Sequence, residues 1–231
     1  MKPLPNNTSF RVTVLTLAAL LAAQAIWLVG AQALDPAIDR LPTNASAAAA
    51  AARHRDAAAL AARIGGVRGD LWAQSAYTYA DLLWDTTANP DPSKALASAR
   101  FSLKQALREA PDTSDAWLML AALASRDRSP GTDVTQALKM SYYTGPSERW
   151  LTPLRFRLAV HSDFVGDIEM RQFISRDLRL LLSEQQKPVI TQAYLAASPA
   201  GRDFIEGTIG DIDPSARSWL RASAEPPPLP N

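Results

Sequence analysis

Hydrophobic residues recur at helical spacing through most of the chain, most clearly over residues 99–124, ARFSLKQALREAPDTSDAWLMLAALA. Leu96, Ala99, Leu103, Ala106 and Ala110 follow one another at steps of three and four residues. That spacing places them on one face of a helix. Because Ala99 and Ala106 are small, this face allows a neighbouring helix to approach closely.

A second helical pattern follows Pro111, which ends the first. Trp117, Leu120, Ala121 and Ala124 share one face of this second helix. A polar turn at 110–114 joins the two patterns, so the stretch predicts an antiparallel helix hairpin. Asp91 followed by Pro92 is typical of a helix start, since aspartate caps the first turn and proline fits the first helical position.

This stretch resembles the tetratricopeptide repeat family, whose repeat has about 34 residues and a Trp-Leu-Gly-Tyr…Ala…Phe…Ala…Pro pattern. The second-helix half of one repeat and the first-helix half of the next are matched by Ala99, Leu103, Ala106, Pro111, Trp117, Leu120 and Ala121. An upstream first helix is suggested by Trp72, Ala76 and Tyr79, with an insertion around Asp85–Pro92. An ordinary helical hairpin with small interface residues is the alternative.

The resemblance implies a protein-binding scaffold, in which first helices line a groove for a partner segment. The groove residues that it implies here are Gln74, Tyr77 and Tyr79.

The rest of the chain also favours helices, and no convincing run of alternating polar and apolar residues predicts a strand. Further helices are expected at 47–64, 67–84, 133–143, 147–161, 166–183, 188–197 and 214–222. The predicted fold is all-α: an N-terminal transmembrane helix and then a degenerate tetratricopeptide-like solenoid of helical hairpins. The expected segments are 1–11 (cytoplasmic), 12–34 (transmembrane), 35–64 (linker and alanine-rich helix), 65–222 (solenoid) and 223–231 (disordered, proline-rich).

The N-terminal region carries an uncharged apolar run, Val12–Leu34, after Lys2 and Arg11. At about 1.5 Å per residue this run is long enough to cross a hydrocarbon core of roughly 30 Å. The preceding positive charges place the N-terminus in the cytoplasm and the remainder outside. A cleaved signal peptide is the alternative, because Ala31–Ala33 forms an A-x-A-like cleavage site; the length of the run favours a retained anchor.

Composition narrows the functional classes. The net charge is +1, which gives no reason to expect nucleic acid as a partner. The chain has no cysteine, which excludes disulfides, thiol chemistry and lipidation at a cysteine. For a Gram-negative source, the topology corresponds to a single-pass inner-membrane protein with a periplasmic C-terminal region.

Residues for catalysis or metal binding are sparse. His54 lies in the alanine-rich segment, and His161–Asp163 holds three triad residue types in adjacent positions, which cannot normally converge. The carboxylate pairs Glu169 with Asp177, and Glu206 with Asp211, are more typical of solvated helix faces than of glycoside chemistry. The sequence therefore predicts no enzyme, no metal site and no cofactor.

One charged cluster is more suggestive. Six arginines lie within about thirty residues: Arg149, Arg155, Arg157, Arg171, Arg176 and Arg179. If the helices that carry them pack antiparallel, several line one basic face, and guanidinium groups bind carboxylates and phosphates in bidentate fashion. Arg155 and Arg176 are the partner-binding candidates; surface arginines paired with nearby acids are the alternative.

The function predicted from these features is a membrane-anchored, periplasm-facing scaffold or adaptor for protein partners of the envelope, in a process such as polysaccharide export or assembly. The alternatives are a module for an anionic glycan or lipid headgroup, an assembly factor for cytochrome maturation, and an enzyme with unrecognised carboxylates. The sequence leaves the oligomeric state open.

Overall fold

The computed structural model describes residues 8–34, 36–84, 91–127, 133–161 and 163–224. The chain is 83% helix, with twelve α-helices and no strand in the part that the structure describes. The predicted all-α class is confirmed. Most of the expected insertion (85–90), Ser162 and the end of the expected tail (225–231) lie outside the described residues.

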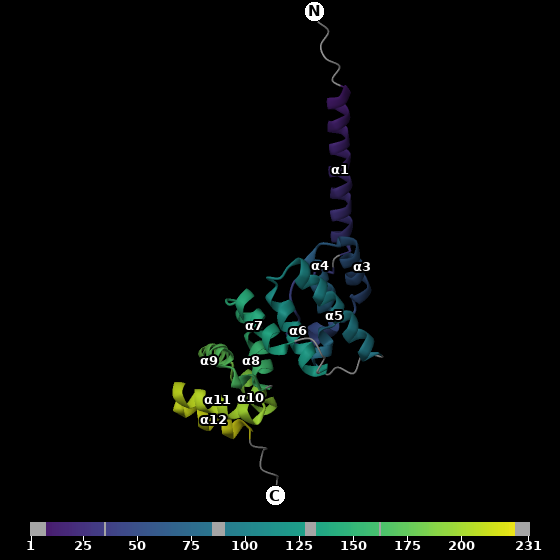
Figure 1. The fold of residues 1–231 in the computed structure, drawn as a ribbon. Coiled ribbons are helices and arrows are strands. Elements are labelled where there is room, and N and C mark those ends of the chain that lie inside the picture. The colour runs from purple at the N-terminus through teal and green to yellow at the C-terminus, as the bar shows by residue number, and fades with distance from the viewer. Residues whose placement is uncertain (1–7, 35, 85–90, 128–132, 162, 225–231) are drawn as a thin grey trace, which may run out of the picture. The chain divides into compact units, whose positions relative to one another are not determined.

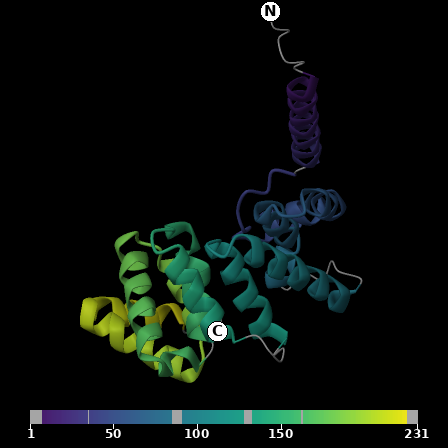
Figure 2. The ribbon, with the colours of Figure 1, turned by 45° about the horizontal axis from the view of Figure 1, so that its top comes forward.

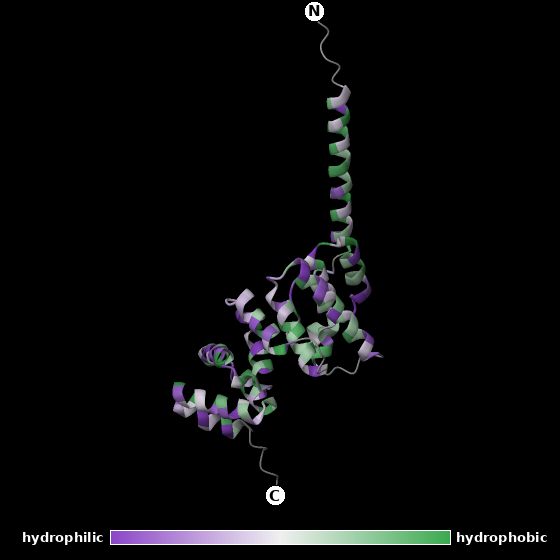
Figure 3. Ribbon diagram, in the orientation of Figure 1, coloured by the Kyte–Doolittle hydropathy of each residue, from purple (hydrophilic) through white to green (hydrophobic). Residues whose placement is uncertain are grey.

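The first helix, α1 (Thr8–Ala33), is long and apolar enough to cross a membrane, by length and composition. Its hydrophobic residues do not follow one stripe, and most of their side chains are exposed. Figure 3 shows hydrophobic residues along the length of this helix. Figures 1 and 2 show α1 as a single uninterrupted helix. Its C-terminal end packs against α3 (Arg55–Gly65).

The chain divides into two compact units, Met1–Asp81 with Thr86–Pro111, and Leu82–Asp85 with Asp112–Asn231. The first unit contains α1 and α3 together with α2 (Ala45–Ala52), α4 (Gly69–Tyr77) and α5 (Pro92–Glu109). The single helix expected over 47–64 is broken between α2 and α3. This break brings the Arg55 guanidinium to the buried carboxylate of Asp81, at 2.6 Å, and to the carbonyl oxygen of Thr78, at 3.2 Å.

The single helix expected over 67–84 is also interrupted. It divides into α4 and a 3₁₀ helix, η1 (Ala80–Trp84). The hydroxyl of Thr78, directly after α4, donates to the carbonyl oxygen of Ser75 at 2.7 Å. A hydroxyl that bonds to the preceding turn competes with the regular backbone pattern, and the chain tightens there.

Helices α4 and α5 form an antiparallel hairpin. Gly69, at the start of α4, packs so closely on the end of α5 that a Cβ atom there would lie 2.7 Å from the Cβ of Ala110. Farther along, the hydroxyls of Ser75 and Ser102 are 3.1 Å apart. The start signal at Asp91 is confirmed, because its carboxylate accepts a hydrogen bond from the backbone N–H of Lys94.

In the second unit, α6 (Ser114–Asp127) packs against α7 (Val134–Thr144). The hairpin expected within 99–124 would join α5 of the first unit to α6 of the second, and it stays a prediction. Of the residues that match the repeat pattern, Ala99, Leu103, Ala106, Leu120 and Ala121 are buried, Trp117 is half-buried and Pro111 is exposed.

The remaining helices complete the second unit. They are η2 (Arg149–Leu151), α8 (Thr152–His161), η3 (Asp163–Gly166), α9 (Ile168–Ser183), α10 (Lys187–Ala196), α11 (Pro199–Ile212) and α12 (Pro214–Ala224). Pro153 lies in the first turn of α8, where a proline fits because the backbone N–H that it lacks would have no partner within the helix. The core side chains from α8 and α9, such as Phe156, Met170 and Ile174, are fully buried.

A close approach between α11 and α8 gives a prediction about stability. A Cβ atom on Gly201 would lie 2.2 Å from the carbonyl oxygen of Val160, so Gly201→Ala must displace backbone. Gly207, on the same helix, has no atom within 4 Å of the equivalent position. We expect Gly201→Ala to lower the free energy of unfolding by about 1–3 kcal/mol, and Gly207→Ala to raise it by about 0.4–1 kcal/mol.

The measurement is urea unfolding of the full chain in detergent micelles, followed by tryptophan fluorescence. Equal effects of the two alanines would contradict the close packing of α11 on α8.

Candidate functional site

The polar residues of the first unit that were expected to line a groove face inward. Gln74 and Tyr77 are buried, and the side-chain oxygen of Gln74 accepts from the backbone N–H of Ile38 at 3.3 Å. Tyr79 is half-buried, with the guanidinium of Arg55 at 4.7 Å from its ring centroid. Gln74 and Tyr77 therefore have almost no accessible surface that a partner could contact, and only part of the Tyr79 side chain is accessible.

The arginine cluster of the second unit forms the most distinctive site. Four of the six arginines line one pocket of about 470 Å³. They come from three elements: Arg149 from η2, Arg155 from α8, and Arg176 and Arg179 from α9. The predicted gathering of several of the arginines is observed, and we call this site the arginine pocket.

Arg157 and Arg171 do not line this pocket. The guanidinium of Arg157 lies 4.2 Å from the ring centroid of Trp84, on a different hollow of the second unit. The Nε atom of Arg171 donates to the carbonyl oxygen of Val165. Both guanidinium groups therefore have contacts outside the arginine pocket.

Arg155 is buried rather than exposed, with 2% of its surface accessible. Its Nε donates to the hydroxyl of Ser141 at 3.0 Å, and its Nη1 to the carbonyl oxygen of Gly145 at 2.9 Å. Its Nη2 donates to the carbonyl oxygen of Ser141. Burial lowers the pKa of Arg155. The expectation that Arg155 belongs to a surface face is therefore wrong. The Arg155 side chain lines the pocket from within the core and donates hydrogen bonds to the end of α7.

A buried carboxylate faces the same pocket. Asp177, on α9, is 4% exposed, and its Oδ2 accepts a hydrogen bond of 2.7 Å from the hydroxyl of Tyr142. Burial raises the pKa of Asp177 to about 6, opposed by the Tyr142 hydrogen bond and by the charges of Arg155 and Arg176. Burial also raises the pKa of Tyr142 well above its ordinary value. This phenol therefore stays protonated and donates a hydrogen bond to Asp177.

The aromatic ring of Tyr142 is fixed on both sides. It stacks on Phe173 of α9, with ring centroids 4.4 Å apart and planes within 6° of each other. The guanidinium of Arg155 lies 4.9 Å from its centroid. Offset aromatic pairs and cation–π contacts both stabilise such an arrangement. The wall of the pocket is therefore rigid.

The arginines at the pocket mouth are more accessible. Arg176 is exposed and donates to the carbonyl oxygen of Pro146. Arg149 has only a 3.9 Å ion pair with Glu184, between two partly exposed side chains. Arg179 is exposed and makes no hydrogen bond or ion pair with any residue that the structure describes.

Both carboxylates of the pocket already have donors. Glu148 accepts from the hydroxyl of Ser114, and Asp177 accepts from Tyr142. The guanidinium of Arg179 is therefore available to a ligand from solvent, and those of Arg149 and Arg176 are exposed beside it with one contact each, to Glu184 and Pro146. A carboxylate or a phosphate is the chemical group that such donors bind best.

A second hollow of about 380 Å³ adjoins the arginine pocket and shares Arg179 and Ser183 with it. Its other lining residues include Leu182, Lys187 and Trp219. The ammonium group of Lys187 lies 5.5 Å from the ring centroid of Trp219. The two hollows together offer cationic groups on one side of Arg179 and an aromatic ring on the other.

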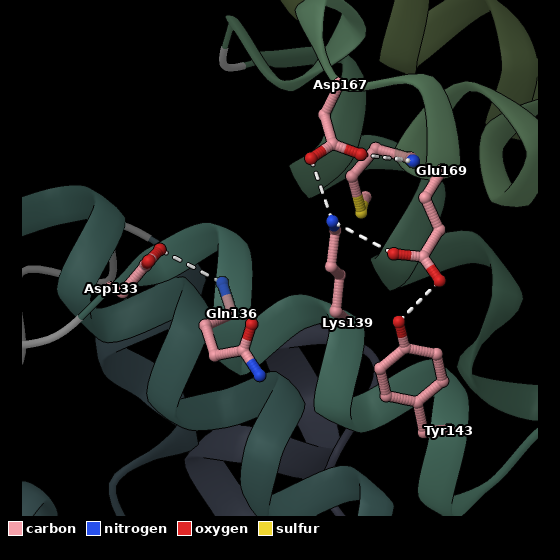
Figure 4. A network of polar contacts seen from close by, with 7 residues as sticks. Asp133, Gln136, Lys139, Tyr143, Asp167 and Glu169 are labelled. Atoms are coloured by element: carbon pink, nitrogen blue, oxygen red, sulfur yellow. Dashed lines mark hydrogen bonds and ion pairs between the residues drawn. The ribbon is translucent and has the colours of Figure 1, made fainter.

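The first turn of α9 is fixed by a surface network, shown in Figure 4. Asp167 caps α9 by accepting from the backbone N–H of Met170, and it also accepts from Lys139 of α7 at 2.8 Å (Figure 4). Lys139 is 3.0 Å from Glu169, which accepts in turn from the hydroxyl of Tyr143. These bonds lower the pKa of both carboxyl groups and raise that of Lys139. The network holds α9 against α7 and so helps to position Arg176 and Arg179.

The carboxylate pairs considered for catalysis do not converge. Glu169 belongs to the surface network, about two helical turns, or roughly 12 Å, from Asp177 along α9. Glu206 accepts from the hydroxyl of Tyr194 at 2.6 Å and pairs with Arg221, whereas Asp211 is exposed.

The histidines are equally separate. His54 is exposed between α2 and α3, and the Nδ1 atom of His161 is 2.6 Å from the carbonyl oxygen of Ala196. Among the described residues, no group of three or more histidines and carboxylates is placed to hold a metal ion.

The residues that sequence reasoning missed are Tyr142, Asp177 as a member of this site, and the segment 146–148. The Gly145–Pro146 pair carried a signal for a turn at this place, but not for binding.

The raised pKa of Asp177 gives a prediction about stability and pH. Its pKa is 3.8 ordinarily and about 6 in the folded chain, so between these values the folded chain binds more protons than the unfolded chain. The free energy of unfolding contributed by this group therefore falls as the pH rises from about 4 to about 6, and then stays constant. We expect a fall of up to about 3 kcal/mol.

The measurement compares the wild-type chain with Asp177→Asn, by urea unfolding in micelles between pH 4 and pH 7.5. The slope in this interval is expected to disappear in the variant. Asp203→Asn, an exposed substitution on α11, is the control. A variant that keeps the wild-type slope would show that Asp177 does not titrate in this range.

Comparisons with protein-family models, with curated proteins and with solved structures find no match to this chain. Its function is therefore inferred from its own residues and their geometry.

Proposed function

We propose that this chain is a membrane-anchored adaptor whose arginine pocket binds an acidic segment of a protein partner. In this proposal, α1 crosses the inner membrane once with its N-terminus in the cytoplasm, and the other helices face the periplasm. An envelope process such as polysaccharide export or assembly is the proposed setting.

The observation that carries the proposal is the excess of cationic donors in the pocket. Four arginines line it, and its two carboxylates, Glu148 and Asp177, already accept hydrogen bonds from Ser114 and Tyr142. The guanidinium of Arg179 has no partner among the described residues. A side-chain carboxylate that enters the pocket gains charge-assisted hydrogen bonds without displacing an existing ion pair of Arg179.

The lining favours an acidic side chain over a sugar ring in the arginine pocket itself. Among the described residues that line it, the aromatic one is Tyr142, whose faces are taken by Phe173 and Arg155. A pyranose ring would find no aromatic platform there.

An anionic glycan is the second candidate ligand, and the adjoining hollow favours it. Trp219 and Lys187 line that hollow, next to the shared Arg179. A glycan with a uronic acid residue would place its carboxylate on Arg179 and a neighbouring ring against Trp219.

The hairpins support the scaffold part of the proposal. Helices α4 and α5 are antiparallel, and their sequences carry the first-helix and second-helix positions of one tetratricopeptide-like repeat. Helices α6 and α7 form the next pair. We propose that the two pairs are degenerate repeats of a solenoid over 65–222, after the linker and helix of 35–64.

The end of α1 supports a retained anchor. Within the A-x-A-like site, Ala31 is 1% exposed and the side-chain oxygen of Gln32 accepts from Nη1 of Arg68 at 2.9 Å. Two contacts therefore tie this end of α1 to the folded unit, although Gln32 and Ala33 themselves are exposed.

The anion-binding prediction uses a fluorescent hexaglutamate peptide and the full chain in micelles. We expect Arg179→Ala to weaken binding about tenfold, because one guanidinium–carboxylate interaction of about 1.4 kcal/mol is lost. Arg108→Ala, which removes an exposed arginine of α5 outside the pocket, is the matched control and should bind as the wild type does. Raising the salt concentration should weaken binding by the wild type.

Two results would count against an acidic peptide. Equal losses in the two variants would mean that binding reflects net charge alone. Binding of polygalacturonate with no measurable binding of hexaglutamate would favour the glycan instead.

The topology prediction uses the absence of cysteine in the chain. Single-cysteine variants Ser9→Cys and Asp203→Cys are treated with a membrane-impermeant maleimide in spheroplasts. We expect Asp203→Cys to react directly and Ser9→Cys to react only after the membrane is permeabilised. The reverse order would overturn the orientation, and loss of residue 9 from the mature chain would show that the N-terminal segment is cleaved.

A further inference from the structure

The junction of α1 with α3 contains an apolar surface that the proposed anchor alone does not explain. Leu60, in the middle of α3, is 48% exposed, and Val67, in the turn before α4, is 69% exposed. Leu60 and Ile64 lie one turn apart on α3, and Val67 follows in the turn after the end of this helix. An exposed apolar side of this kind commonly marks a contact with a partner or a membrane.

Two hydrogen bonds fix this segment beside α1. The indole Nε1 of Trp27 donates to the carbonyl oxygen of Ile64 at 2.6 Å, and Arg68 donates to Gln32 at 2.9 Å. Trp27 lies about four residues before the buried Ala31, well inside α1. Measured along the axis of α1, the end of α3 therefore lies at the same height as Trp27, within the apolar run of α1.

The length of α1 relates this level to the bilayer. Arg11 is the charged residue at the start of the apolar run, and about 20 residues from Val12 are needed to cross a hydrocarbon core of roughly 30 Å. The far boundary of that core then falls near Ala31. Trp27, four residues earlier, lies about 6 Å inside it, because a helix rises about 1.5 Å per residue.

We propose that the segment Leu60–Val67 is a second membrane contact, inserted beside α1 into the periplasmic leaflet. This inference rests on the proposed span of α1. Amphipathic segments that lie in a membrane interface reach a depth of roughly 5–10 Å, which agrees with the level of Ile64. The carbonyl oxygen of Ile64 supplies the indole of Trp27 with an acceptor at a depth where water is scarce.

The charges around the segment fit lipid phosphates. Arg63 is exposed on α3, whereas the guanidinium of Arg68 is held by Gln32 and Asp70. A long basic side chain such as that of Arg63 reaches from an inserted backbone to the headgroup level. The partner is therefore the bilayer itself, with apolar side chains in the acyl region and the guanidinium group of Arg63 at the phosphates.

The test places an environment-sensitive fluorophore on single cysteines of the full chain. Variants Val67→Cys and Leu60→Cys probe the segment, Leu20→Cys marks the middle of α1, and Ile168→Cys, 75% exposed on α9, marks a water-facing site. The chains are reconstituted in vesicles of phosphatidylethanolamine and phosphatidylglycerol that carry a nitroxide on the acyl chain.

We expect quenching at positions 67 and 60 to approach that at position 20 and to exceed that at position 168 several-fold, with blue-shifted emission. Quenching at 67 and 60 no greater than at 168, with strong quenching at 20, would overturn the second contact and leave the anchor intact. No quenching at 20 would overturn the span of α1 and, with it, this inference.

Discussion

One buried guanidinium, that of Arg155, joins α8 to the end of α7 in the second unit. The last carbonyl oxygens of a helix have no partner within the helix, and burying them unpaired is costly. At the end of α7, the carbonyl oxygens of Ser141 and Gly145 each accept one backbone N–H, and Arg155 of α8 supplies each with a second donor. These bonds join α8 to the end of α7, next to the segment 146–149 that lines the pocket.

The pocket combines rigid and accessible parts. Tyr142 is clamped between Phe173 and Arg155, and the network around Lys139 fixes the start of α9. By contrast, Arg179 extends from α9 without a partner among the described residues. When a ligand binds, the exposed guanidinium groups can adjust to it while the backbone of the pocket stays in place. The protein therefore loses little conformational entropy on binding.

The sequence predicted the features that depend on local spacing. The apolar run of α1, the cap at Asp91 and the grouping of arginines on α8 and α9 are properties of neighbouring residues, and all three are found. The breaks after Ala52 and Tyr77 were not predicted, because they depend on Arg55 reaching Asp81 and on the hydroxyl of Thr78. The burial of Arg155 was missed for the same reason, since its acceptors lie ten and fourteen residues away.

The burial of Arg155 together with Asp177 has an evolutionary consequence. Each charge moderates the cost of burying the other, because Asp177 raises the pKa of Arg155 and Arg155 lowers that of Asp177. Loss of one partner leaves an uncompensated buried charge, whereas replacing both with apolar residues is often tolerated. The two positions are therefore expected to change together during divergence. Homologues that have lost both charges would keep the fold without this pocket wall.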